Sequence, residues 1–385
     1  MSEKLKKYFR GDSIIWAILI ALSILSLLAV YSSTFTLAYK YRAGNIGYYL
    51  VKHVLFIFFG FSIVYITHLI PYIYYSRISQ LLLIISVPLL IITMFFGTSI
   101  NEASRWLTLP GTGITFQTSD LAKLALIMYV ARLLSLKQGN IRSYKDAFLP
   151  IILPVLLICA LIMPANLSTA VLLFMVSVIL MFIGRIRFTY IALVVGGIMI
   201  ILSIVITIAV KSEWEGRWET WYNRVIHHME QDSEGNYQSE QSKIAIVNGG
   251  LFGKGPGNSM QRNFLPQPYS DFIFAIIVEE YGLLGGVFVI LIYLALLFRA
   301  GMLVRNSTRT FPAFLAFGLA LMLVLQAMVN ISVAAGLIPV TGQPLPMISM
   351  GGTSVLFTSA AIGIILSVSS GINRQKREAA LANVS

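Results

Sequence analysis

Apolar stretches of about 20 residues recur along almost the whole chain, and no other feature limits its fold as strongly. A helix of that length crosses the roughly 30 Å of hydrocarbon in a bilayer. Only 11% of the residues are charged, against about 25% in a typical soluble protein. The pattern therefore predicts an all-α polytopic membrane protein with ten transmembrane helices and one large extracytoplasmic loop. The ten predicted spans are 13–33, 50–69, 79–98, 117–135, 147–163, 169–185, 188–210, 271–298, 312–333 and 353–371.

The net charge of +12 could indicate a nucleic-acid partner, but the distribution of the basic residues argues against one. If the N-terminus is cytoplasmic, Lys and Arg gather in both tails and in the loops on that side. The short loops on the other side are poor in them, as the positive-inside rule requires. We therefore assign the charge to topology and to contact with the anionic lipid bilayer, with both termini cytoplasmic and no nucleic acid bound.

Three segments on the outer side are longer than ordinary connections, namely 99–117, 212–270 and 336–352. The last is rich in Pro and Gly but too apolar for a solvated loop. Irregular backbone near a bilayer is tolerated when it is buried in protein, so we expect 336–352 to fold back into the mouth of the bundle. The large insert 212–270 is the first candidate for the working site. Its Trp214, Trp218 and Trp221 predict an amphipathic helix at the membrane interface.

Four acidic residues lie within or at the ends of predicted spans, where an ionised group is costly and usually has a role. Asp120 and Lys123 share a helix face, which predicts an ion pair that either fixes helix packing or lines a cavity. Asp271 starts a predicted span, so its position alone favours a helix cap. Glu279 and Glu280 lie deeper, and an internal hydrogen-bonded pair is the favoured interpretation of these two.

The glycine-rich stretch 248–257 resembles a phosphate loop only superficially, since the strand context and the Lys-Ser/Thr pair of a Walker motif are missing. Together with Lys254 and Arg262 it would either cradle a phosphate or let chain segments approach closely. His227 and His228 are adjacent and lack a third ligand at helical spacing, so no zinc site is expected. The single Cys159 excludes an intramolecular disulfide.

Three ordered blocks of this sequence resemble the SEDS proteins of bacterial cell envelopes. The first contains Tyr237-Gln238, Gln241-Ser242-Lys243-Ile244-Ala245, Gly249–Gly255 and Phe264–Ala275. The second contains Gln326, Asn330, Gly336–Pro346 and Ser349–Ser354. The third contains Arg105-Trp106-Leu107, Gln117–Asp120 and Lys123. The likeness extends over the ten-helix body.

The resemblance implies an inverting peptidoglycan glycosyltransferase that polymerises lipid II, a disaccharide-peptide on a polyprenyl pyrophosphate, at the outer face of the bacterial cytoplasmic membrane. It also implies one membrane domain, 1–385, with an extracytoplasmic loop at 212–270 and cytoplasmic tails at 1–12 and 372–385. The forms of the sequence at 255–259 and 266–271 look more like the cell-division member than the elongation member. We therefore expect the protein at the division site.

Residue roles follow from the resemblance where the residues match. The essential acid of the family corresponds to Asp271, which reverses the cap interpretation and implies a general base or a ligand for Mg²⁺ or Mn²⁺. The family motif Pro-Asp-x-Gly-Thr appears at 164–169 without its carboxylate and with one added residue, so we expect no catalytic role there. No organic cofactor is expected. The substrate-binding residues that the resemblance implies are Arg105, Asp120, Lys123, Lys254, Arg262, Gln238 and Ser349.

The family also implies a protein partner, a single-pass class B penicillin-binding transpeptidase, together with other division proteins. Two other functional classes fit the composition equally well: a flippase that moves lipid II across the bilayer, and a scaffold that recruits division proteins. A role in elongation is a further alternative. No inverted repeat is evident between the halves of the sequence, which weakens the transporter interpretation.

Overall fold

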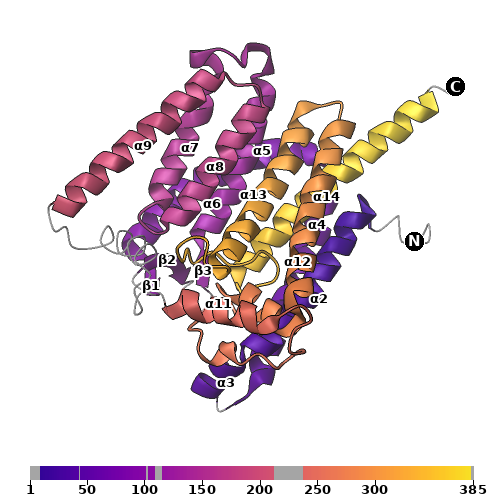
Figure 1. Cartoon of the computed structure of the whole chain (residues 1–385). Coiled ribbons are helices and arrows are strands. Elements are labelled where there is room, and N and C mark those ends of the chain that lie inside the picture. The colour runs from indigo at the N-terminus through magenta and orange to yellow at the C-terminus, as the bar shows by residue number, and fades with distance from the viewer. Residues whose placement is uncertain (1–8, 43, 101–102, 109–114, 212–236, 383–385) are drawn as a thin grey trace.

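The computed structural model describes residues 9–42, 44–100, 103–108, 115–211 and 237–382, and Figure 1 shows them as a bundle of long helices. The long helices are α2 (Ser13–Ser33), α4 (Ile46–Leu69), α5 (Tyr72–Phe96), α6 (Thr118–Leu136), α7 (Leu149–Ile162), α8 (Leu167–Ile183), α9 (Phe188–Lys211), α12 (Ile273–Asn306), α13 (Thr310–Ala334) and α14 (Thr353–Ala382). Each of the ten predicted spans overlaps one of them. The predicted helical, polytopic membrane architecture is confirmed.

The ten long helices differ in length and hydropathy, which decide whether a helix can cross a membrane. Among the described residues, seven helical stretches are long and apolar enough to cross a membrane. α8 and the stretch Phe188–Ile201 of α9 are apolar but shorter. α6 carries Asp120, Lys123 and Arg132 within its 19 residues, which lowers its hydropathy. Ten crossings therefore stay a prediction.

Short elements connect the helices at both ends of the bundle. They are α3 (Phe35–Arg42), α11 (Tyr237–Gly249), the 3₁₀ turns η1 (Gln138–Asn140) and η3 (Gln261–Asn263), the π-helical turn η2 (Tyr144–Phe148), and the strands β1 (Thr98–Ile100), β2 (Ala103–Thr108) and β3 (Thr115–Gln117). The strands form one antiparallel sheet in the order β1-β2-β3. This small sheet is an addition to the predicted all-α fold, and it leads directly into α6.

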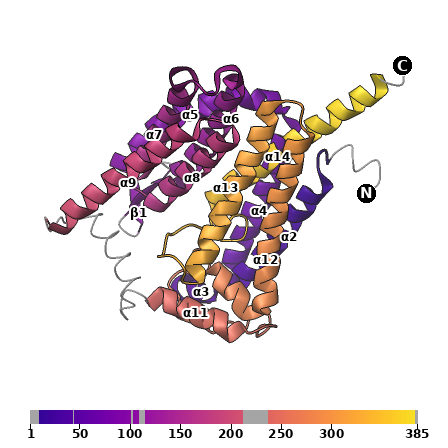
Figure 2. The same cartoon turned by 45° about the horizontal axis from the view of Figure 1, so that its top comes forward.

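The helix α13 lies at the centre of the bundle and packs against α6, α8, α12 and α14. α4 lies along α14, and α5 lies along α6 (Figures 1 and 2). Apolar side chains fill the space around α13, among them the fully buried Leu315 and Leu319. Large apolar side chains on α4 and α5, such as Phe58 and Ile84, are exposed on the outside. That distribution suits a bundle whose outer surface meets lipid chains.

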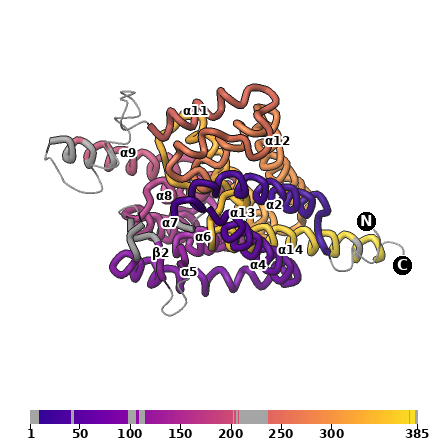
Figure 3. The backbone as a smooth tube through the Cα atoms, turned by 90° about the horizontal axis from the view of Figure 1, so that it is seen from below, coloured from indigo at the N-terminus to yellow at the C-terminus, as the bar shows by residue number. Residues whose placement is uncertain are grey.

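α9 lies apart from the compact body of the bundle and slants away beyond α8, with which it makes contact (Figures 1 and 3). The segment that follows α9, with the predicted interfacial helix around Trp214, Trp218 and Trp221, lies outside the described residues. The chain is described again from α11, which packs on α12 and α13. At the other end of the chain, α14 continues to Ala382, so the described part of the predicted C-terminal tail is helical.

The long helix α12 is broken at Gly282, whose φ of 71° and ψ of −175° are not helical. The glycine-rich loop fills the break. N–H groups at 254–255 donate to the carbonyls at 279–280, and N–H groups at 283–284 donate to the carbonyls at 250–251. The loop thus satisfies backbone groups that the break removes from the helical ladder.

Glycine is required on both sides of this contact. A Cβ on Gly282 would lie 2.2 Å from the carbonyl oxygen of Leu251, and one on Gly249 would lie 2.0 Å from the carbonyl oxygen of Val278. A Cβ on Gly253 would lie 2.2 Å from a carbonyl oxygen in α12. Of the two roles predicted for the glycine-rich stretch, close approach of chain segments is therefore confirmed.

Candidate active site

The loop 336–352 folds back into the bundle, as predicted from its composition. Gln343, Leu345, Ile348 and Ser349 are all buried. Several of its carbonyl groups accept hydrogen bonds from helix side chains: Tyr293 of α12 donates to Pro346 O, and Ser26 of α2 donates to Ile348 O. A buried irregular segment needs such partners for its backbone, and the surrounding helices supply them.

Two amide side chains of α13 bind this loop from the centre of the bundle. Gln326 Nε2 donates to Pro344 O at 3.0 Å. Asn330 Nδ2 donates to Gln343 O at 2.7 Å. The Gln343 amide in turn donates to the hydroxyl of Thr169 near the start of α8. The loop is therefore fixed by hydrogen bonds to helices that are distant from it in sequence.

Asp120 and Lys123 form an ion pair in the first turns of α6, with 2.8 Å between Lys123 Nζ and Asp120 Oδ1. Their side chains are only 4% and 6% exposed. Lys123 Nζ also donates to Gln326 Oε1 at 3.2 Å, so the pair is linked through Gln326 to the loop. The ion pair predicted from the three-residue spacing is confirmed, and its role in binding substrate stays a prediction.

Asp271 lies just before α12, which begins at Ile273 with Phe272 at the N-cap position. Asp271 is thus one residue outside the cap position that its place in the sequence first favoured. Its side chain is partly exposed and accepts a hydrogen bond from Ser270 Oγ at 3.0 Å. Asn330 Nδ2 donates to its backbone carbonyl at 2.9 Å.

The segment before Asp271 is bound to the same buried loop. Ser349 Oγ donates to Ser270 O at 2.7 Å and accepts from Leu345 N at 2.8 Å. Met350 N donates to Tyr269 O at 2.9 Å. These bonds hold the backbone on both sides of Asp271 Cα, since Asn330 binds its carbonyl and the loop binds its predecessors. Asp271, Asp120, Lys123 and Ser349 therefore belong to one hydrogen-bonded assembly.

Lys254 and Arg262 belong to a different assembly, at the break in α12. Lys254 Nζ lies 2.8 Å from Glu279 Oε1. Arg262 Nη1 donates to Ser32 at both its carbonyl (3.3 Å) and its hydroxyl (3.1 Å), and its guanidinium lies over the ring of Phe35. Both cations thus have structural partners, and their predicted contact with a pyrophosphate stays a prediction.

Glu279 and Glu280 are fully buried and hydrogen-bonded, but not to each other as the sequence suggested. Glu279 accepts from Ser259 Oγ, from Lys254 Nζ and from the N–H groups of Met260 and Gln261. Glu280 accepts from Ser32 Oγ and from Ser259 N. The two acids therefore connect the loop 254–262 to α12 and α2.

The remaining predicted substrate residues are less closely tied to this assembly. Gln238 is exposed in the first turn of α11, whereas Ser242 of the same helix is buried and donates to Ala334 O at 2.6 Å. Arg105 lies in β2, and its side chain is outside the described residues. β2 pairs with β3, whose last residue precedes α6. The strand therefore lies near the end of α6 that holds Asp120.

Several buried polar atoms around the loop have no hydrogen-bond partner among the described residues. They are Asp120 Oδ2, Asn330 Oδ1, Thr341 Oγ1 and Asn166 Nδ2. A buried polar atom without a partner costs about 1–3 kcal/mol, so such atoms cluster where a polar ligand or water supplies the missing bond. The assembly offers acceptors and donors suited to sugar hydroxyls, and a carboxylate at Asp271 that can accept a proton.

No group of three or more His, Cys, Asp or Glu side chains that could hold a metal ion occurs in the described part of the chain. Mg²⁺ in enzymes of phosphate chemistry is commonly held by one or two carboxylates together with substrate phosphates. Asp271 is one such carboxylate, and it is partly exposed. The residues present fit a cation that arrives with its substrate.

Three amide side chains organise this assembly, namely those of Gln326, Asn330 and Gln343. The sequence alone assigned no site role to them. A signal was available for the first two, because they are two amides four residues apart on an otherwise apolar helix and hence on one face. Gln343 gave no such signal. Asn166, in the segment 164–169 that lacks the family acid, caps α8 by accepting from Thr169 N at 3.1 Å.

Comparison with known proteins gives matches over nearly the whole chain. Residues 12–374 match the model of the cell cycle protein family that is named for FtsW, RodA and SpoVE. A protein of Aliivibrio salmonicida named a probable peptidoglycan glycosyltransferase FtsW is 34% identical over 365 residues, covering 92% of this chain and 88% of that protein. A protein of Trichlorobacter lovleyi with the same name is 33% identical over 382 residues, covering 97% of each.

Solved structures share the fold. One chain of a peptidoglycan synthase complex, described as coordinating polymerization and crosslinking, superposes with a TM-score of 0.73 at 24% identity, covering 94% of this chain and 98% of that one. The rod shape determining protein RodA of Thermus thermophilus superposes with a TM-score of 0.67 at 23% identity, covering 94% and 97%. At these identities the likeness concerns the fold.

Proposed function

Because this chain belongs to the FtsW, RodA and SpoVE family of cell cycle proteins, we propose that it is a peptidoglycan glycosyltransferase that polymerises lipid II at the outer face of the cytoplasmic membrane. Its relatives carry the name of that activity over almost the full length of the chain. The family expected from the three sequence blocks is thereby confirmed. The protein is a multi-span protein of the inner membrane.

The main observation behind the proposed site is that the buried loop 336–352 and α13 fix the backbone around Asp271. Asn330 binds its carbonyl, and Ser349 binds the residue before it. The same α13 face connects this loop to the buried pair of Asp120 and Lys123. A carboxylate on a fixed backbone, beside polar atoms that still need partners, is what a general base and its sugar-binding groups require.

Asp271 would act as the general base of an inverting transfer. Its carboxylate takes the proton of the acceptor 4-hydroxyl while that oxygen attacks the donor anomeric carbon. The bond from this carbon to the pyrophosphate oxygen breaks, and the polyprenyl pyrophosphate leaves with the electron pair. Inversion from the α-linked pyrophosphate gives the β-linked glycan, so no covalent enzyme intermediate is needed. General base catalysis of this kind contributes about 10²–10⁴-fold in rate.

A divalent cation, Mg²⁺ or Mn²⁺, would be held by Asp271 together with the substrate phosphates. When bound, it would neutralise the charge that develops on the leaving pyrophosphate. Asp271 would then orient the cation instead of taking the proton. Activity that survives removal of divalent cations by a chelator assigns Asp271 to the base role.

The expected partner is a class B penicillin-binding transpeptidase that crosslinks the product. A structural neighbour of this chain forms part of a peptidoglycan synthase complex, which supports such an arrangement. The names of the curated relatives favour the division site over the elongation machinery. A fluorescent fusion of the full chain concentrated in a midcell band supports the division role, and one dispersed along the side wall contradicts it.

Polymerisation of purified lipid II by the full chain, with and without its transpeptidase, tests the function. We expect Asp271→Asn to insert and accumulate normally but to form at least about 100-fold less glycan. Glu240→Gln, which removes an exposed acid on α11 at the same end of the bundle, is the matched control. Wild-type polymerisation by Asp271→Asn would exclude the base role.

The flippase and scaffold alternatives are separated by the same assay. In detergent there is no second compartment, so a flippase cannot give glycan chains there, whereas a polymerase does. A pure scaffold is likewise inactive with lipid II. Recruitment of division proteins by the inactive Asp271→Asn variant shows scaffolding as an additional role.

A further inference from the structure

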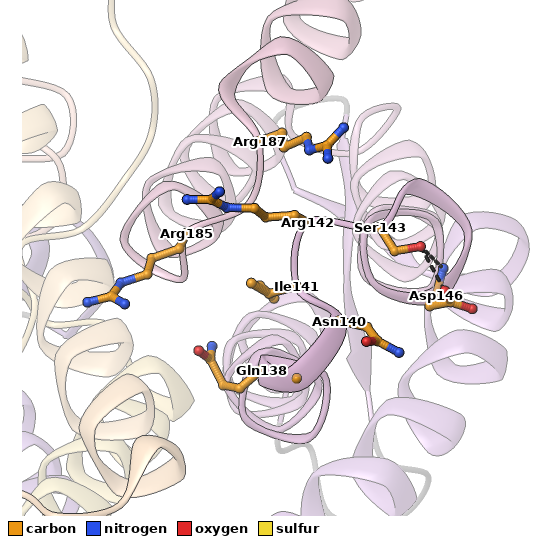
Figure 4. Close-up of a pocket in the computed structure, with 9 residues that line it drawn as sticks. Gln138, Asn140, Ile141, Arg142, Ser143, Asp146, Arg185 and Arg187 are labelled. Atoms are coloured by element: carbon orange, nitrogen blue, oxygen red, sulfur yellow. Dashed lines mark hydrogen bonds between the residues drawn. The ribbon is translucent and has the colours of Figure 1, made fainter.

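The end of the bundle opposite to Asp271 contains a basic pocket that the proposed reaction does not use. It lies after the last residue of α6, about 28 Å along that helix from the turn that holds Asp120. The pocket has a volume of about 600 Å³ and is formed by the α6–α7 and α8–α9 connections. Figure 4 shows its polar side chains, which include Gln138, Arg142, Ser143, Asp146, Arg185 and Arg187.

The charges of the pocket are unbalanced. Three arginines, Arg142, Arg185 and Arg187, line the pocket together with a single acid, Asp146. That carboxylate already accepts from Ser143 Oγ at 2.7 Å and is drawn on the far side of the pocket from Arg185 (Figure 4). Within the described residues, no side chain is hydrogen-bonded or ion-paired to the guanidinium of Arg142 or Arg185. The pocket therefore carries a net charge of about plus two, which suits an anion with two charges.

Arg185 is held in an unfavourable backbone conformation. It follows α8 with a φ of 69°, a region that L-residues rarely adopt and that glycine occupies at most helix ends of this kind. Its position is fixed, because Ile186 N donates to Met181 O at 3.1 Å and Gln138 reaches from η1 toward the end of α8. An arginine in a conformation that glycine adopts without strain points to a function for its side chain.

The surroundings of the pocket favour a lipid over a soluble anion. Phe182, Ile183 and Phe188, which flank Arg185 and Arg187 in sequence, are 61%, 40% and 67% exposed. They belong to the ends of α8 and α9, two apolar helices. A phosphate in the pocket would thus have its acyl chains beside exposed apolar side chains, whereas free pyrophosphate would gain nothing from them.

The third arginine is oriented by aromatic rings. Arg187 Nη1 donates to the hydroxyl of Tyr190 at 3.3 Å, and its guanidinium lies 5.9 Å from the ring centroid of Tyr190. That ring packs against Tyr144 and Phe148 of the facing connection. An aromatic cluster therefore joins the α6–α7 and α8–α9 connections, and its Tyr190 ring orients the guanidinium of Arg187.

We propose that this pocket binds the headgroup of an anionic phospholipid, with a preference for one that carries two phosphates. Arg142 and Arg185 bind the phosphates, Arg187 completes the basic wall, and the exposed side chains at 182–188 contact the acyl chains. The site is independent of the proposed polymerase activity, since it lies at the other end of the bundle.

The test is native mass spectrometry of the purified full chain with diphosphatidylglycerol or with phosphatidylcholine of the same acyl chains. We expect the wild type to prefer diphosphatidylglycerol. The double variant Arg142→Gln/Arg185→Gln should bind it about 25-fold more weakly, at about fivefold for each arginine, or ~1 kcal/mol each. The control Arg305→Gln, an exposed arginine on α12 outside the pocket, should bind as the wild type does. Equal binding by the wild type and the double variant overturns the proposal.

Two further measurements sharpen the result. Inorganic pyrophosphate at the same phosphate concentration should not displace the lipid, and full displacement would make this a soluble-anion site instead. Arg185→Gly should unfold at a higher temperature than the wild type in lipid-free detergent, because strain is relieved, yet bind diphosphatidylglycerol about fivefold more weakly. An Arg185→Gly variant that binds lipid like the wild type overturns the role given to Arg185.

Discussion

The buried pair of Asp120 and Lys123 gives a prediction whose size follows from the structure. At 2.8 Å, and with an effective dielectric constant of about 20, two unit charges attract by ~6 kcal/mol. Both side chains are almost fully buried, so each has lost most of its hydration. In Asp120→Leu the ammonium of Lys123 would keep, among the described residues, the bond to Gln326 at 3.2 Å alone. Breaking a buried pair in this way typically costs about 3–5 kcal/mol.

Replacing both partners should restore most of that stability. The double variant Asp120→Leu/Lys123→Met contains no buried charge, and exchanges of this kind are often neutral or stabilising. It leaves the Gln326 carbonyl oxygen without its donor, which costs about 1–3 kcal/mol. We therefore expect the free energy of unfolding to be highest for the wild type, intermediate for the double variant and lowest for the single variant.

Unfolding by SDS in mixed micelles, followed by tryptophan fluorescence, measures these free energies. The exposed pair of Arg374 and Glu378 provides the control, and Glu378→Gln should leave the unfolding curve unchanged. A single variant Asp120→Leu as stable as the wild type would refute the reasoning from burial. The double variant also separates two roles, since a folded but inactive protein indicates that the pair binds the substrate.

Three other predictions concern the packing around the site. Gly282→Ala should abolish the folded peak in size-exclusion chromatography, because its Cβ would meet backbone at 2.2 Å and its φ is positive, whereas Gly301→Ala, with open space around it, should not. Asn330→Leu should lower glycan formation from lipid II and speed amide exchange in the loop 336–352, because two carbonyl groups lose their donor. Glu279→Gln should speed proteolysis within 254–262, since it removes the charge that binds this loop, and unchanged cleavage would contradict that role.

The sequence predicts the helical body well and its boundaries less well. Apolar runs of bilayer length locate all ten long helices, because hydropathy reports directly on burial in lipid. The span predicted at 79–98 begins at Tyr72 in the structure, because residues 72–78, which include the polar Ser76 and Arg77, belong to the first turns of α5 and not to a loop. The strands β1 to β3 are too short to give a periodic signal, and their pairing becomes visible only in the structure.

The candidate site was likewise predictable from the sequence in part. The resemblance singles out Asp271, Asp120, Lys123 and Ser349, and the structure brings these four into one assembly. The sequence cannot show that Lys254 is ion-paired with Glu279, because that contact depends on the break in α12 and on the loop that fills it. Composition and spacing identify the charged residues, whereas the pairing among them follows from the tertiary packing.

The break at Gly282 also determines which part of α12 crosses the bilayer. The 34 residues of α12 would extend about 51 Å as one straight rod, far more than the roughly 30 Å of hydrocarbon. Residues 273–280 are buried in protein on all sides, whereas exposed apolar side chains begin at Leu283 and recur as far as Met302. The 24 residues from Leu283 to Asn306 extend about 36 Å, which matches one crossing with slight tilt. The break thus separates residues 273–281, which fold back beside Gly286 and are enclosed by protein, from one lipid-facing segment, so that changes in membrane thickness are taken up by Leu283–Asn306.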